Sequence, residues 1–273
     1  MHPADELDAR NLEEMDRMDS KSFVKDISKA RKCSALGSAG VFLVVGIVMA
    51  GLSLASLAES VDLVTSNPQR WYELEKVINP NAVSSLQTEK PDLVSAAGLS
   101  FHMPQAADGN YAVYMVSDYY GSLAGMKMTV TVQISSLSTA TPAFDFYDPT
   151  DSYPTEPPCV RLFFQDKLGG WNCSDYWWSI YQDSTLGLTG HMELDGVSSF
   201  TLTTAFLPQY WSDIWGHVGS SNEWHIQEFN DALDDIHGIG LSLGGQFHNY
   251  AAGIGLTSGD AMFVIESCVI SEA

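Results

Sequence analysis

The chain has 273 residues, and its 34 Asp and Glu residues outnumber 13 Lys and Arg residues, which gives a net charge of −21 at pH 7. This acidity excludes binding to nucleic acid and charge-driven docking on anionic lipid, because both partners require a positive surface. Beyond residue 58 the chain holds 26 acidic residues against 6 basic ones, over a length that suffices for one domain with its own core.

The N-terminal part of the chain has the pattern of a membrane anchor. Residues 1–33 form a charged segment that we predict to be a solvated cytoplasmic tail, and residues 34–58 contain no charged residue. Because roughly 20 apolar residues suffice to cross a bilayer, residues 34–58 are predicted to form a transmembrane helix. Basic residues between 21 and 32 place the N-terminus inside and the rest of the chain outside the cytoplasm. A signal peptide cleaved after Ser56-Leu57-Ala58, or a buried helix, is the alternative interpretation.

Residues 59–103 are predicted to form a membrane-proximal stalk or cap. Within them, a helix is expected over residues 69–78, because Asn67 suits an N-cap and Pro68 suits the first helical position. Trp71 and Ile78 belong to an apolar face of this helix that needs a packing partner.

From residue 104 to 273 the pattern changes to short strands separated by turn residues, which indicates an all-β sandwich. Residues 126–135 alternate apolar and polar side chains, as a strand with one buried face does. A single helix is expected over residues 222–236, and the Asp- and Pro-rich segment 138–158 is predicted to be a long loop. The predicted strands are residues 111–117, 126–135, 160–165, 176–182, 190–194, 199–207, 238–243, 252–256 and 261–271.

The C-terminal segments resemble a known fold family. The strand FTLTTAFLP from Phe200, the helix and strand FNDALDDIHGIGLSLGG, the turn FHNYAAGIGLTSGDA and the strand MFVIESCVI follow one another in this order. This order resembles the C-terminal half of galactose-binding-like jelly-roll domains, which occur in extracellular bacterial proteins and carbohydrate-binding modules. The resemblance implies a jelly-roll sandwich and rests on pattern rather than on an invariant motif.

Aromatic residues with polar neighbours suggest a carbohydrate site, because sugar rings stack on flat side chains and amides bind the hydroxyl groups. Core packing is the alternative for each of them, and in a strand Tyr176 and Trp178 face opposite to Trp177, so one set belongs to the core. Trp211 is expected in the core, whereas Trp171 lies in a glycine-rich turn and is expected to be exposed. The candidate ligand-binding residues are Trp171, Asn172, Tyr176, Trp178, Tyr210, Trp215 and Trp224.

Metal and disulfide sites are restricted to a few positions. Asp145, Asp148 and Asp151 lie within one loop and offer oxygen ligands suited to a structural calcium ion, although a solvated acidic loop explains the same residues. The histidines show no ligand spacing, so no transition-metal site is expected. Cys159 and Cys173 are predicted to form a disulfide outside the cytoplasm.

The sequence favours binding over catalysis. It contains no P-loop and no H-E-x-x-H motif, no G-x-S-x-G nucleophile elbow is expected, and acid pairs carry little information in so acidic a chain. We therefore expect a non-enzymatic, membrane-anchored module that binds carbohydrate or another surface ligand outside the cytoplasm. One alternative is a structural protein that assembles a cell-envelope layer or membrane complex, and a third is an anchored glycan hydrolase. The sequence leaves open whether the chain is a homo-oligomer.

Overall fold

The computed structural model describes residues 60–78, 85–147, 156–166, 176–180, 182–183, 185–245 and 252–273. By its contacts the chain divides into two units, Met1–Leu54 and Ala55–Ala273, and all described residues belong to the second. The predicted tail and the predicted span 34–58 lie outside the described residues. Among the described residues, no helix has both the length and the apolar character needed to cross a membrane.

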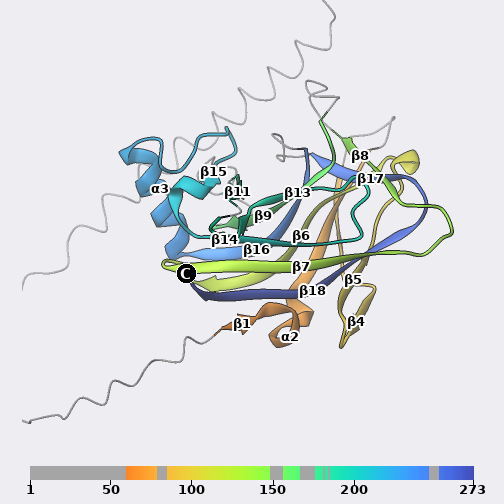
Figure 1. The fold of residues 1–273 in the computed structure, drawn as a ribbon, viewed down its shortest axis with the longest axis horizontal. Helices are drawn as coiled ribbons and strands as arrows, with labels where there is room; N and C mark the ends of the chain where they lie inside the picture. Colours follow the sequence, from red (N-terminus) through yellow and green to blue (C-terminus); the bar gives the residue numbers. More distant parts are fainter. Residues whose placement is uncertain are drawn as a thin grey trace, which may run out of the picture. The chain divides into compact units, whose positions relative to one another are not determined.

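The second unit is an all-β structure of two antiparallel sheets (Figure 1). The first sheet is built around β7 and β18, which pair along almost their whole length from Ala261↔Ser136 to Glu272↔Met126. Strands near both ends of this unit meet here, because β1 also pairs with β18. The order of this 8-stranded sheet is β11 (Gln182–Asp183), β12 (Leu188–Thr189), β14 (Ser199–Ala205), β7 (Met126–Ser136), β18 (Ala261–Glu272), β5 (Gly98–His102) and β4 (Leu93–Ser95), with β1 (Val61–Asp62) on β18.

The second sheet is built around three long central strands, β9, β16 and β6. Its outer strands attach to parts of these, so that β13 pairs with the first half of β9 and β10 with the second half. The order of this 10-stranded sheet is β15 (Trp211–Ser212), β10 (Tyr176–Ser179), β9 (Cys159–Gln165), β16 (Ile236–Gly244), β6 (Asn110–Gly121), β17 (Gly253–Ser258) and β8 (Ala143–Tyr147), with β13 (His191–Glu193) on β9, β2 (Trp71–Val77) on β6 and β3 (Ser85–Glu89) on β2.

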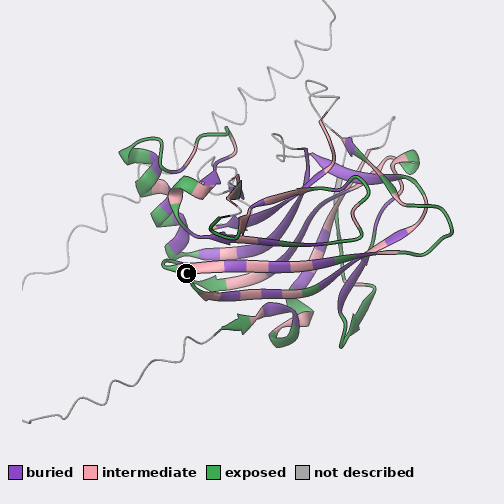
Figure 2. Cartoon of the chain, in the orientation of Figure 1, coloured by how far each residue is buried: buried purple, intermediate pink, exposed green. Residues whose placement is uncertain are grey.

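One core lies between the two sheets. Val130 and Leu202 of the first sheet and Leu162 and Leu241 of the second belong to the same buried cluster. Figure 2 shows the result, with buried residues concentrated in the central strands and exposed ones in the turns and on the outer side of the helix α3 (Glu223–Asp234). The predicted β-sandwich character is therefore confirmed.

The helices are few and short. Asn222 caps α3 by accepting a hydrogen bond from the His225 amide at 3.0 Å, which confirms the predicted start of this helix. In Figure 1, α3 lies at the end of the unit opposite to β8 and β17. The other helical segments are α2 (Leu63–Ser66), η1 (Pro68–Arg70), η2 (Ala106–Asp108) and η4 (Pro208–Tyr210).

The region before residue 104 differs from the sequence-based expectation. The helix predicted over residues 69–78 is wrong, because only η1 is helical and β2 follows it, paired with β6 from Trp71↔Ser117 to Val77↔Asn110. Residues expected to form a stalk or cap instead supply β1 to β5, which belong to the two sheets. The sandwich thus begins well before residue 104.

Candidate functional site

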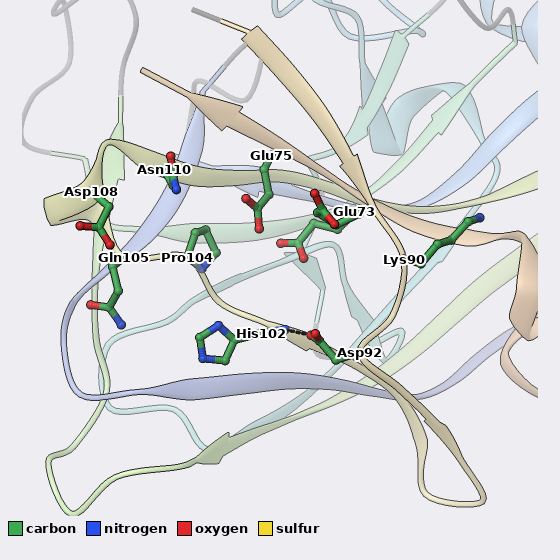
Figure 3. A pocket seen from close by; sticks show the side chains of 10 residues that line it. Glu73, Glu75, Lys90, Asp92, His102, Pro104, Gln105, Asp108 and Asn110 are labelled. Carbon is green, nitrogen blue, oxygen red and sulfur yellow. Dashed lines mark hydrogen bonds between the residues drawn. The ribbon is translucent and has the colours of Figure 1, made fainter. Parts of the chain in front are cut away.

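A cavity of about 360 Å³ lies between elements of the two sheets. Five of its lining residues carry carboxylates, and they come from β2, β3, the turn before β4, and η2 (Figure 3). The lining residues are Glu73, Glu75, Glu89, Lys90, Asp92, His102, Pro104, Gln105, Asp108 and Asn110.

Strand alternation directs the acidic side chains of β2 into this cavity. Trp71 is fully buried in the core between the sheets, and Glu73 and Glu75 follow it at intervals of two. The intervening Tyr72 and Leu74 pack on the other side of the sheet. Because β3 pairs with β2 in the register Glu73↔Glu89, a third carboxylate is placed beside Glu73.

Glu73 is the most unusual group in the cavity. Only 2 % of it is exposed, and its Oε1 atom is buried without a hydrogen-bond partner. Burial raises the pKa of Glu73 well above its ordinary value, and the nearby charges of Glu75, Asp92 and Glu89 raise it further. Burial likewise raises the pKa of Glu75, together with the charges of Glu89 and Asp92.

The nearest basic side chains do not neutralise Glu73. The Lys90 ammonium donates to the main-chain oxygens of Gln69 and Trp71 at 3.2 and 3.3 Å, and in Figure 3 it points away from the carboxylates. His102 lies across the cavity from Glu73, and its Nε2 is 2.6 Å from Asp260 Oδ1. Neither of these basic side chains forms a hydrogen bond or an ion pair with Glu73.

Asn110 supplies a second buried acceptor. Its Oδ1 atom, like Oε1 of Glu73, is buried without a hydrogen-bond partner, and Asn110 lines the same cavity at the start of β6. An unpartnered buried acceptor costs free energy, so two of them in one cavity leave bonding capacity that a ligand or water can use.

The raised pKa of Glu73 links stability to pH. The folded state binds this proton more tightly than the unfolded state does, so its contribution to stability is fully present below the unfolded-state pKa, near 4.5. It is lost as the pH rises from there towards the raised folded-state pKa. A cation beside the carboxylate would offset that loss, because it favours the charged form.

Comparison with known proteins adds no relative. No family model, curated protein or solved structure matches the chain. The interpretation of the cavity therefore rests on its own chemistry.

The aromatic residues predicted to bind a ligand fall into three groups. Trp215 and Trp224 are 68 % and 59 % exposed, as stacking platforms must be. Tyr176 and Tyr210 are half-buried. Trp178 is only 3 % exposed and its Nε1 donates to Ser242 Oγ at 3.0 Å, so it is unavailable for stacking, because it packs in an aromatic cluster on the outer face of the second sheet.

The remaining predicted ligand and metal residues are scattered or undescribed. Trp171 and Asn172 lie outside the described residues, as do Asp148 and Asp151. Asp145 is exposed on β8, so of the three predicted calcium ligands it is the one that the structure describes.

The predicted disulfide is not found among the described residues. Cys159 is a free, buried thiol whose pKa is raised to about 11, chiefly by burial, and Cys173 lies outside the described residues. Cys268 is a free buried thiol, as expected from its apolar surroundings.

Gly240–Gly244 does have the G-x-S-x-G spacing that is typical of hydrolase nucleophile elbows, contrary to expectation. It lies inside β16, whereas an elbow requires a sharp turn from strand to helix. Ser242 is fully buried and receives the indole N–H of Trp178, so it is not an exposed nucleophile.

Proposed function

We propose that this chain is a non-enzymatic binding module whose acidic cavity takes a hard divalent cation of the calcium type. The observation that carries the proposal is the pair of buried, unpartnered oxygens, Glu73 Oε1 and Asn110 Oδ1, in a cavity lined by carboxylates. Among the described residues no three of these carboxylates already lie close enough together to share one ion, so binding requires their side chains to move together. Calcium takes six to eight oxygen ligands from carboxylates, amides and water. A neutral ligand would satisfy the hydrogen bonds but leave the mutual repulsion of the carboxylates in place.

The proposal places this module outside the cytoplasm, anchored through residues 34–58. The uncharged run and its basic inner flank support the anchor. The two antiparallel sheets around one core are compatible with a galactose-binding-like jelly roll, which is the family the C-terminal segments resemble.

We expect calcium to stabilise the protein through Glu73. At a free Ca²⁺ concentration 100 times its Kd, the wild-type protein should gain about 2.7 kcal/mol, which corresponds to a rise in Tm of roughly 5–10 °C for a domain of this size. Glu73→Gln keeps the shape of the side chain but removes the charge that calcium needs, so most of this gain should disappear. Scanning calorimetry and calorimetric Ca²⁺ titration at pH 7 measure both effects.

Asp231→Asn is the matched control, because Asp231 is an exposed carboxylate on α3. Its response to calcium should equal that of the wild type. Without calcium, Glu73→Gln should be more stable than the wild type at pH 8, since it no longer loses a proton in a buried site. Equal calcium responses of the wild type and Glu73→Gln would contradict the proposal.

A second candidate function is carbohydrate binding at the exposed tryptophans. Trp215 and Trp224 expose large ring surfaces, and the exposed Asn222 lies two residues before Trp224 in the chain. If sugars stack there, the double change Trp215→Ala and Trp224→Ala should weaken glycan binding about tenfold to a hundredfold without lowering Tm. A glycan array followed by titration of the best hit provides the measurement. An array without any hit would remove this second function.

A further inference from the structure

A second cluster of metal-ligating side chains lies at the end of the sandwich that carries α3. Asp213 follows β15, His217 ends the turn after it, and His225 lies in the first turn of α3. We propose that these three residues bind a transition-metal ion of the zinc class. The inference is independent of the calcium proposal, since the acidic cavity contributes none of these residues.

The three side chains already lie at the separations that one ion requires. One potential ligand atom from each lies within 4.8 Å of the others. The His217 and His225 rings have centroids 4.8 Å apart, and His217 Nδ1 is 3.1 Å from Asp213 Oδ2. Metal–ligand bonds of about 2.0–2.2 Å place two ligand atoms of a tetrahedral site roughly 3.3–3.5 Å apart, so small side-chain adjustments suffice.

The backbone around the cluster is fixed by hydrogen bonds. Asp213 is 5 % exposed, and its Oδ1 accepts the amides of Trp215 and His217 at 2.9 and 2.8 Å. These bonds leave Oδ2 as the oxygen directed to His217. Asn222 caps α3 through the His225 amide, which fixes the position of His225 at the start of the helix.

The decisive observation is the bonding of the His225 ring. His225 is only 8 % exposed, and its Nε2 atom is buried without a hydrogen-bond partner. Its Nδ1 is 2.8 Å from Ser221 Oγ. If Nδ1–H donates to this hydroxyl, Nε2 presents a lone pair, and this is how metal-ligating histidines are commonly oriented by a neighbouring acceptor. A metal ion would supply the missing partner of Nε2.

The ligand set selects the class of metal. Two imidazole nitrogens and one carboxylate oxygen suit zinc and its first-row neighbours, whereas calcium prefers oxygen ligands alone. Three protein ligands leave one position open for water or another ligand. The Trp224 ring packs edge-on against His225, with centroids 4.7 Å apart, so its fluorescence reports on the cluster.

The test uses the full chain with Zn²⁺ and Co²⁺ as probes. Zinc titration should show a site that Glu73→Gln retains, and Co²⁺ should give visible d–d absorption and quench tryptophan fluorescence. His225→Ala and His217→Ala should each lower the zinc affinity at least about 100-fold, because removing a ligand costs more than removing a residue that only orients one, for which the loss is roughly tenfold to a hundredfold. Ser221→Ala should lower it about tenfold to a hundredfold, because Ser221 orients His225.

His237→Ala is the matched control, because His237 forms a similar pair with Asp235, at 3.3 Å, but belongs to no three-residue cluster among the described residues. Its zinc affinity should equal that of the wild type. His217 is exposed, so His217→Ala keeps the test valid if His225→Ala fails to fold. The proposal is overturned if Co²⁺ gives no absorption, or if His217→Ala binds zinc as tightly as the wild type does.

Discussion

Trp211→Ala should lower the free energy of unfolding by about 3–5 kcal/mol, the usual cost of removing a large buried ring. Trp211 is fully buried, and its Nε1 donates to the Ala205 carbonyl at 2.9 Å. Its ring stacks on Phe206 and meets Phe164 edge-on, with centroids 5.1 and 4.9 Å away. The change would therefore open a cavity and leave the Ala205 carbonyl without its side-chain partner.

Trp215→Ala is the matched control, four residues along the same segment. Because Trp215 is 68 % exposed, its removal should change stability by no more than about 0.5 kcal/mol. Urea denaturation followed by circular dichroism measures both variants. A loss at Trp211 as small as that at Trp215 would show that Trp211 does not belong to the core that the structure assigns to it.

The strands after residue 104 could be predicted because one face of each is buried. In β7 the buried residues Met128, Val130 and Val132 alternate with less buried ones, and the same alternation is visible in the sequence. The core position of Trp211 and the start of α3 were also predicted correctly. These features depend on local periodicity and capping, which a single sequence contains.

The error over residues 69–78 has a local cause and a non-local one. Asn67 and Pro68 do start a helical segment, but it is only the short η1. The Asn67 side chain forms no capping hydrogen bond to η1. Trp71, Leu74 and Ile78 fit a helical face, yet Trp71, Glu73 and Glu75 also alternate as in a strand. Pairing with β6 over the length of β2 decides in favour of the strand over the helix, and the sequence does not show that pairing.

The acidic cavity could not be predicted for the same reason. Glu73 and His102 lie on different sheets, and Asn110 joins them only because β6 starts beside the cavity. In so acidic a chain, no spacing distinguishes these carboxylates from the others. Similarly, alternation places Trp178 on the outer face of its sheet but cannot show that this position is buried.

Gly98→Ala should be the second severe change. It should also disturb the cavity, because Gly98 and His102 lie on the same strand, β5. Gly98 starts β5 with a φ of 129°, a region that L side chains rarely adopt. An added Cβ would lie 2.3 Å from the Ile265 carbonyl oxygen and 2.9 Å from Glu266 Cα, both backbone atoms of β18. Backbone strain and overpacking together should cost about 2–5 kcal/mol.

The consequence for the cavity separates this prediction from a general loss of stability. To relieve the clash, β5 must move away from β18, where Leu99 pairs with Ile265 and His102 with Met262. The calcium affinity proposed for the cavity should then fall in the fraction that remains folded.

Gly196→Ala is the control, since Gly196 also has a positive φ, of 67°, but no atom lies within 4 Å of the added Cβ. Gly196→Ala should lower the free energy of unfolding by only roughly 1–2 kcal/mol, the cost of placing an L side chain in this backbone conformation. Its calcium affinity should equal that of the wild type. Equal losses of stability in the two variants would show that contact with β18 is not what requires glycine at position 98.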